Sequence, residues 1–98
     1  PRTPGEARLL AERLLGTLRR YDDARGTALL ESLRVFLQLN RSWQRAASML
    51  SVHKQTLVYR MRRVEELTGR RLDSTEDVAE LWIALRADEA TGRALLGR

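Results

Sequence analysis

Apolar residues recur at helical intervals along most of the chain, and the alternation typical of strands is absent. Near the start, leucines three or four residues apart predict a helix from about residue 6 to residue 20, ending near Tyr21-Asp22-Asp23. Gly26-Thr27 supplies a break and an N-cap residue for a second helix. This helix is expected to end at Asn40, a residue tolerated in the left-handed conformation after a helix. Two amphipathic helices therefore open the chain.

The middle of the chain has the spacing of a helix-turn-helix. Ser42 is the expected N-cap of a short helix that reaches about Leu50, and a longer amphipathic helix follows over residues 54–68, closed by Gly69. Ser51 occupies the turn position where glycine is common because that position takes a positive φ. Two helices that meet at a steep angle need a small residue at their contact and bulky apolar residues beyond the turn. The residues in these roles are Ala47, Val52, Leu57, Met61 and Val64.

The pattern after residue 69 predicts a loop and a fifth helix. Leu72 is the expected apolar anchor of that loop. Ser74 and Asp77 have the spacing of a capping box, with Asp in place of the usual Glu, and apolar residues then recur from Val78 to Leu85. The sequence therefore predicts an all-α fold, a small bundle of about five helices that contains a helix-turn-helix.

The length of 98 residues suits one bundle, within which we assign three parts. Residues 1–26 are expected to form an N-terminal helix and connector that pack on the bundle, residues 27–90 the helix-turn-helix domain, and residues 91–98 a tail. Pro1 stands where an initiator methionine would be, and no signal-like or membrane-length apolar segment occurs. We expect a fragment of a cytoplasmic protein that does not contact a membrane.

The residues that carry chemistry argue against an enzyme or a metal site. There is no cysteine and His53 is the sole histidine, so a metal site would rest on carboxylates alone. Asp22-Asp23 and Glu65-Glu66 are adjacent pairs whose side chains point in different directions, and no glycine-rich phosphate loop is present. We expect no catalytic residue, no cofactor and no bound metal.

The net charge of +5 is concentrated in one part of the chain. Residues 41–71 hold eight basic and two acidic residues, whereas the remainder holds ten basic and eleven acidic residues. A charge run is usually a solvated helix face, but this one coincides with the helix-turn-helix pattern. Double-stranded DNA is therefore the preferred partner. The alternative is a helical protein–protein interaction or dimerisation module that binds no nucleic acid.

Several segments of the chain match the pattern of one bacterial family. Residues 53–60 read His-Lys-Gln-Thr-Leu-Val-Tyr-Arg where the family pattern is His-Arg-Asn-Thr-Leu-x-Tyr-Arg, so Lys54 and Gln55 are departures from it. The other matching segments are Tyr21-Asp22, Leu29–Arg34, Glu65–Arg70 and Leu81–Arg86. Over about residues 18–87 the chain resembles the C-terminal helix-turn-helix domain of PucR-type (purine catabolism regulator, also CdaR-like) bacterial transcription regulators. The resemblance implies a larger protein with an N-terminal sensory region, acting as a homodimer and binding DNA through this domain.

The helix over residues 54–68 is expected to enter the major groove with its polar face. Gln55 lies near the N-terminus of that face and is the first candidate to read a base, since its amide can form two hydrogen bonds with adenine N6 and N7. Thr56 can hydrogen-bond a base or pack its methyl group on thymine. Cationic side chains are expected at the phosphates, and we assign Lys54, Arg62 and Arg63 to that role.

Three further residues of this segment are candidate phosphate contacts. His53 lies at the N-cap position, so a capping or packing role competes evenly with a phosphate contact. Tyr59 lies on the outward face, where its hydroxyl suits a phosphate oxygen. Arg60 lies near the apolar side, so an ion pair with a carboxylate of the second helix, Glu31 being one candidate, competes evenly with a phosphate contact.

The start of the preceding helix is a second candidate contact with the DNA backbone. Ser42, Trp43 and Gln44 lie where free N–H groups of the first turn favour an anion. For Trp43 the alternative to a contact with the DNA backbone is a position in the hydrophobic core. Trp82 in the last helix is expected in the core rather than at an interface.

Overall fold

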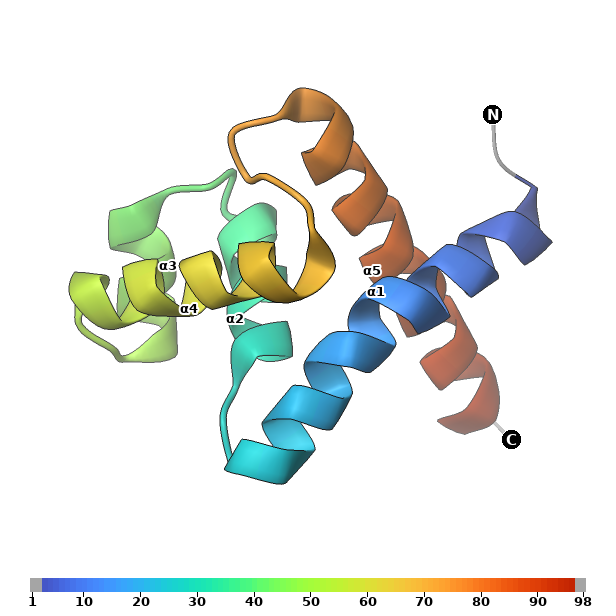
Figure 1. Cartoon of the computed structure of the whole chain (residues 1–98), viewed down its shortest axis with the longest axis horizontal. Coiled ribbons are helices and arrows are strands. Elements are labelled where there is room, and N and C mark those ends of the chain that lie inside the picture. The colour runs from blue at the N-terminus through green and yellow to red at the C-terminus, as the bar shows by residue number, and fades with distance from the viewer. Residues whose placement is uncertain (1–2, 97–98) are drawn as a thin grey trace.

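A computed structural model describes the backbone of residues 3–96 and the side chains of residues 3–90 (Figure 1). Helices form most of this part of the chain. No strand occurs in this part of the chain. The predicted all-α bundle of five helices is confirmed. In order, the helices are α1 (Pro4–Arg25), α2 (Leu29–Gln38), α3 (Trp43–Leu50), α4 (Lys54–Thr68) and α5 (Thr75–Leu96).

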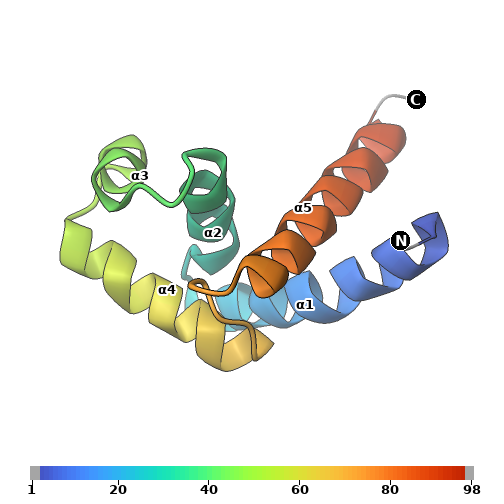
Figure 2. The same ribbon diagram turned by 90° about the horizontal axis from the view of Figure 1, so that it is seen from above.

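The two long helices and the helix-turn-helix lie at different ends of the molecule. α1 and α5 pack against each other, while α3 and α4 lie together at the opposite end (Figures 1 and 2). α2 lies between these two pairs and contacts each of the other four helices. The starting end of α1 and the finishing end of α5 both lie on the side away from α3 and α4. The helix-turn-helix is therefore supported by the rest of the bundle and remains open on its outer side.

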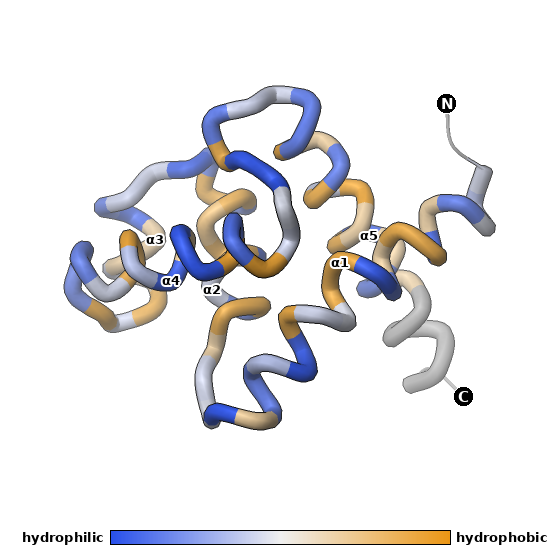
Figure 3. Tube along the Cα trace, in the orientation of Figure 1, coloured by the Kyte–Doolittle hydropathy of each residue, from blue (hydrophilic) through white to orange (hydrophobic). Residues whose placement is uncertain are grey.

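The hydrophobic core lies around α2. Leu33 and Phe36 of α2 are at most 2% exposed and belong to one cluster with buried residues of α1, α4 and α5. Figure 3 shows apolar segments of these helices gathered toward the centre of the molecule. The same apolar periodicity that predicts the helices therefore buries them. The side chains with no exposed surface include Leu15, Leu18, Leu57, Val64, Leu81 and Leu85.

The predicted end of the first helix near residues 21–23 is wrong. α1 continues through these residues to Arg25 and is closed by Gly26, whose φ of 66° is left-handed and whose N–H bonds the Asp22 carbonyl at 2.8 Å. An aspartate ends a helix when its carboxylate hydrogen-bonds nearby backbone N–H groups in place of the helical hydrogen bonds. Here the Asp22 carboxylate is occupied elsewhere, and the helix is not interrupted.

The Asp22 carboxylate caps the next helix from a distance. Its Oδ1 accepts from the Leu29 N–H at 2.8 Å and its Oδ2 from the Leu30 N–H at 3.1 Å, which satisfies two free donors of the first turn of α2. The N-cap residue itself is Ala28, whose side chain makes no capping bond. The prediction that Thr27 caps α2 is therefore wrong, and the Thr27 hydroxyl instead donates to Asp22.

Removing this cap is expected to destabilise the fold. Asp22→Ala leaves the Leu29 and Leu30 N–H groups without their acceptor, and we expect a loss of about 0.5–2 kcal/mol in the free energy of unfolding. Urea denaturation followed by circular dichroism measures it. Asp23→Ala is the matched control, because Asp23 is exposed. Equal losses in the two variants would contradict the capping role of Asp22.

The other helix ends follow the predicted chemistry in most cases. α2 ends at Gln38, before the predicted end at Asn40, and Leu39 is its C-cap. Asn40 has the expected left-handed conformation (φ 56°), and Arg41 shares it (φ 62°). Ser51 (φ 56°) also takes the positive φ expected in the turn. The Ser74 hydroxyl accepts from the Asp77 N–H at 3.2 Å, but the Asp77 carboxylate accepts from the Arg71 N–H and completes no reciprocal box.

The last helix is longer than the apolar pattern indicates. α5 continues through Thr91 and Gly92 to Leu96, where the sequence pattern predicts a tail. Residues 97 and 98 of that predicted tail lie outside the described residues. The division into parts at residues 26 and 90 stays a prediction.

Candidate nucleic-acid interface

The turn between α3 and α4 has the backbone of a tight helix-turn-helix. Ser51 ends α3 in the left-handed conformation, and the Val52 N–H bonds the Ala47 carbonyl at 3.0 Å. Ala47 is 5% exposed and Leu57 has no exposed surface, as the predicted roles of small contact residue and buried plug require. These contacts fix the direction in which α4 leaves the turn.

α4 has one buried and one exposed face, as the sequence predicts. Its buried residues are Leu57, Met61, Val64 and Thr68. Its exposed residues on the opposite side are Gln55, Tyr59, Arg62 and Glu66. The residues of its first turn, Lys54, Gln55 and Thr56, are all exposed. The surface that α4 offers to a partner is therefore polar, and it is cationic at Lys54 and Arg62.

His53 has the capping role that the sequence left as one of two alternatives. Its Nδ1 accepts from the Gln55 N–H at 3.0 Å. Because Nδ1 accepts, the neutral imidazole carries its proton on Nε2. The cap fixes the backbone of Gln55, the first candidate to read a base.

The beginning of α3 presents polar groups beside this surface. The Ser42 hydroxyl caps α3 by accepting from the Arg45 N–H at 3.2 Å, and Gln44 is exposed. Trp43 has the predicted alternative role, since it is partly buried with its ring centre 4.5 Å from that of Phe36. Arg45 is exposed and absent from the residues predicted for the site, although it belongs to the basic run of the sequence.

Arg60 does not form the ion pair with Glu31 that the sequence raised as one possibility. Its Nη1 donates to the Ser32 Oγ at 2.9 Å. Ser32 has no exposed surface and its hydroxyl donates to the Ala28 carbonyl at 2.6 Å. Glu31 directly precedes Ser32 on α2, so its side chain points away from the α2–α4 contact. Glu31 is exposed to solvent. Arg60 thus fastens α4 to α2.

Two consecutive arginines of α4 have different surroundings. Arg62 is exposed and forms no hydrogen bond or ion pair within the described residues. Arg63 is partly buried and binds the Tyr59 hydroxyl and the Glu66 carboxylate. The Arg63 guanidinium donates to the Tyr59 hydroxyl and lowers the pKa of the Tyr59 phenol below its ordinary value. The predicted phosphate contact therefore fits Arg62 better than Arg63.

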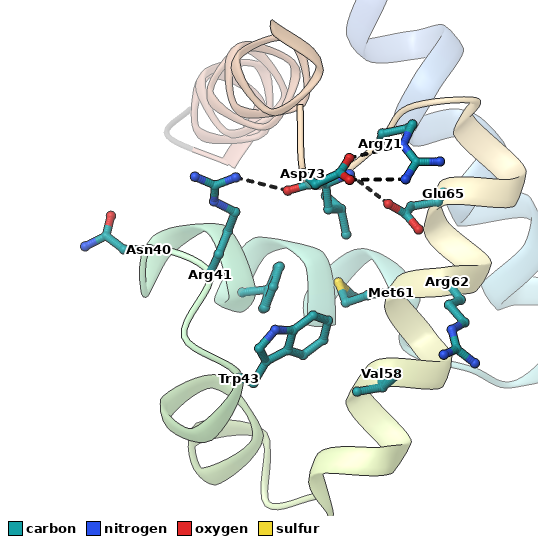
Figure 4. A pocket seen from close by; sticks show the side chains of 11 residues that line it. Asn40, Arg41, Trp43, Val58, Met61, Arg62, Glu65, Arg71 and Asp73 are labelled. Carbon is teal, nitrogen blue, oxygen red and sulfur yellow. Dashed lines mark hydrogen bonds and ion pairs between the residues drawn. The ribbon is translucent and has the colours of Figure 1, made fainter. Parts of the chain in front are cut away.

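A cavity of about 650 Å³ lies on one flank of α4, between α2, α3 and the α4–α5 loop (Figure 4). Its polar groups hold that loop in place: the Leu72 carbonyl accepts from Arg41 Nη1 at 3.0 Å, and the Leu72 N–H donates to Glu65 Oε2 at 2.8 Å. Asp73 pairs with Arg71, whose guanidinium lowers the pKa of that carboxyl. The two bonds to Leu72 were not predicted, because they join the loop to residues of other segments, Arg41 and Glu65. The cavity walls therefore brace the end of α4.

Neither a metal site nor a membrane-spanning helix is found within the described residues. No group of three or more His, Cys, Asp or Glu side chains among them is placed to hold a metal ion. Within the same part of the chain, every helix is too short or too polar to cross a membrane. The exposed faces of α3 and α4 are thus the main candidate site.

Comparison with known proteins identifies the family. The profile of the PucR C-terminal helix-turn-helix domain matches residues 29–87. The chain is 38% identical over 86 residues to the transcriptional activator PmfR of Paenarthrobacter nicotinovorans, across 88% of this chain and 18% of PmfR. It is 37% identical over 59 residues to the purine catabolism regulatory protein of Bacillus subtilis (strain 168), across 60% of this chain and 11% of that protein.

A further relative is the uncharacterized protein YsfB of Bacillus subtilis (strain 168), 32% identical over 83 residues, across 85% of this chain and 21% of YsfB. The chain thus spans about a fifth of the length of PmfR and YsfB. No solved structure matches it. The family is one of transcription regulators and not of enzymes. The chain belongs to the PucR C-terminal helix-turn-helix family, as the resemblance of its sequence predicts.

Proposed function

We propose that the chain is the DNA-binding domain of a bacterial transcription regulator and that α4 reads duplex DNA in the major groove. The observation that carries the proposal is the exposed outer face of α4, whose polar side chains are free of the core. An α-helix fits the major groove, which is about 12 Å wide. The names of two relatives, a transcriptional activator and a purine catabolism regulatory protein, support a regulatory role. Binding to bacterial DNA would place the protein in the cytoplasm.

The exposed side chains divide into base readers and phosphate contacts. Gln55 and Thr56 lie in the first turn of α4, from which recognition helices reach base edges. Phosphate oxygens accept hydrogen bonds, so N–H and O–H donors on exposed or partly buried side chains suit them. In this proposal the phosphate contacts are Ser42, Gln44, Arg45, His53, Lys54, Tyr59 and Arg62. Arg60 serves mainly to hold α4 on α2.

Separate variants test the two roles on a duplex first selected from a random library. Gln55→Ala is expected to weaken the selected site by about 1–3 kcal/mol and to leave random duplex nearly unchanged, because a base contact carries sequence information. Arg62→Ala is expected to weaken both duplexes alike. Fluorescence anisotropy at several salt concentrations measures both affinities. Arg8→Ala is the control, since Arg8 is an exposed cation in the first turns of α1, and these turns lie at the other end of the molecule from α3 and the beginning of α4 (Figure 1).

Salt dependence decides between this proposal and the alternative of a helical protein-interaction module. Three exposed cations near the α4 surface, Arg45, Lys54 and Arg62, predict a slope of log K against log salt of about −3, with about −0.9 per phosphate contact. Arg62→Ala should make the slope shallower by about one unit. A flat dependence in the unsubstituted chain would favour the protein-interaction module.

A further inference from the structure

The Arg63 guanidinium lies against two tyrosines from different helices. Its Nη2 donates to the Tyr59 Oη at 3.0 Å, and its Nη1 pairs with Glu66 Oε1 at 2.9 Å. Its Cζ lies 5.5 Å from the ring centre of Tyr59 and 5.8 Å from that of Tyr21, near the end of α1. Distances of this size allow a cation–π attraction. The contacts therefore join α1 to the outer side of α4 through one side chain.

These contacts leave Arg63 poorly suited to hold a phosphate itself. An arginine binds a phosphate best with two parallel N–H groups on neighbouring nitrogens. In Arg63 both terminal nitrogens already have partners, and Nε is buried without a hydrogen-bond partner among the described residues. Arg62 beside it is exposed, and its guanidinium has no such partners within the described residues. The sequence motif alone does not distinguish these two arginines.

Tyr59 gains a defined hydrogen-bonding role from the same contact. Its side chain is 57% exposed on the outer face of α4, and its oxygen accepts from Arg63. The Arg63 bond occupies an acceptor position of the phenol oxygen, so the phenol O–H is still able to donate, and phosphate oxygens are acceptors. Accepting a bond from a cation polarises the O–H, in line with the lowered pKa of Tyr59. The Arg63 bond therefore holds the Tyr59 phenol in place and polarises its O–H.

We propose that Arg63 is a positioning residue, which holds the Tyr59 phenol ready to donate to a DNA phosphate while Tyr21 supports Arg63 from α1. The inference rests on the proposed function, since it requires that Tyr59 contacts DNA. Ordering a flexible side chain at an interface costs conformational entropy, and a preorganised side chain avoids that cost. Loss of Arg63 should therefore weaken DNA binding by about 3- to 10-fold through Tyr59.

A double-mutant cycle on the selected duplex tests whether Arg63 acts through Tyr59. Arg63→Gln is expected to weaken binding by about 3- to 10-fold in the unsubstituted chain and by less than 2-fold in the Tyr59→Phe background, where the donor is already lost. The cycle is evaluated on variants whose circular dichroism shows intact helices. A direct phosphate contact of Arg63 would instead give equal losses in both backgrounds and a salt slope shallower by about one unit, which would overturn the proposal.

The phenol pKa gives a readout that needs no DNA. Arg63→Gln should raise the pKa of Tyr59 toward its ordinary value of 10.0, because the hydrogen bond and charge that stabilise the phenolate are removed. NMR titration of ¹³C-labelled tyrosine rings resolves Tyr59 from Tyr21. Arg62→Gln is the matched control, and it should leave the Tyr59 pKa unchanged.

The two readouts separate the failure of this inference from the failure of the proposed function. If the unsubstituted chain binds duplex DNA but Arg63→Gln leaves the Tyr59 pKa unchanged, or the cycle shows no coupling, the positioning role is wrong and DNA binding stands. If the unsubstituted chain shows no salt-dependent binding to duplex DNA, the proposed function fails and this inference fails with it. A raised pKa together with coupling in the cycle supports both.

Discussion

Leu57→Ala is expected to lower the free energy of unfolding by about 2–5 kcal/mol. Leu57 has no exposed surface and lies in the first turns of α4, just beyond the turn from α3. Removing its isobutyl group loses apolar burial and leaves a cavity where the two helices meet. The loss is a large part of the 5–15 kcal/mol that typically stabilises a domain. Urea denaturation followed by circular dichroism measures it.

The same variant tests whether the fold and the DNA-binding surface depend on each other. Leu57→Ala should lose DNA affinity in proportion to the unfolded fraction, because Leu57 is absent from the exposed face. Tyr59→Phe is the control: it removes one exposed hydroxyl, so the free energy of unfolding should stay nearly unchanged. Unchanged stability of Leu57→Ala would mean that α4 is rotated relative to the structure described above.

Local chemistry in the sequence accounts for the elements that bear the proposed site. α4 spans the predicted residues 54–68, because its beginning and end are fixed by local signals: His53 at the N-cap and Gly69 in the left-handed conformation. The apolar period of the same segment also predicts which face is buried. Such signals act within one or two turns, so a sequence shows them directly.

The features that the sequence did not predict depend on contacts between helices. From the sequence, Asp22 predicts the end of a helix. Its carboxylate accepts from the Leu29 and Leu30 N–H groups only after α1 and α2 pack together, and a sequence does not show this contact. Arg60 selects the buried Ser32 hydroxyl over Glu31 because of the rotation of α2 against α4. A long arginine side chain reaches several possible partners, and only the packing decides among them. Roles of cations were therefore the least predictable part of the site.

Joining two copies of the domain is expected to raise DNA affinity by about 10²- to 10⁴-fold over the single domain. One recognition helix reads only a few base pairs, which is too little for a unique site in a genome, so we propose that the full-length regulator binds as a homodimer to two half-sites. In a tethered pair the second binding event becomes intramolecular, and affinity rises without any new contact. The starting end of α1 and the finishing end of α5 face away from α4 and offer attachment points that leave the α4 surface open.

The spacing between half-sites provides the decisive measurement for this model. Two half-sites on the same face of the duplex lie about 10 base pairs apart, or a multiple of that distance, and moving one by about five base pairs turns it to the opposite face. A pair joined by a short linker should then lose most of its gain, because the linker no longer spans both sites. The measurement compares the single domain, the pair on the selected spacing and the pair on the shifted spacing at one salt concentration. Equal affinity of the single domain and the pair, or indifference of the pair to the shift, would contradict binding to two half-sites, because either result removes the geometric coupling on which the dimer depends.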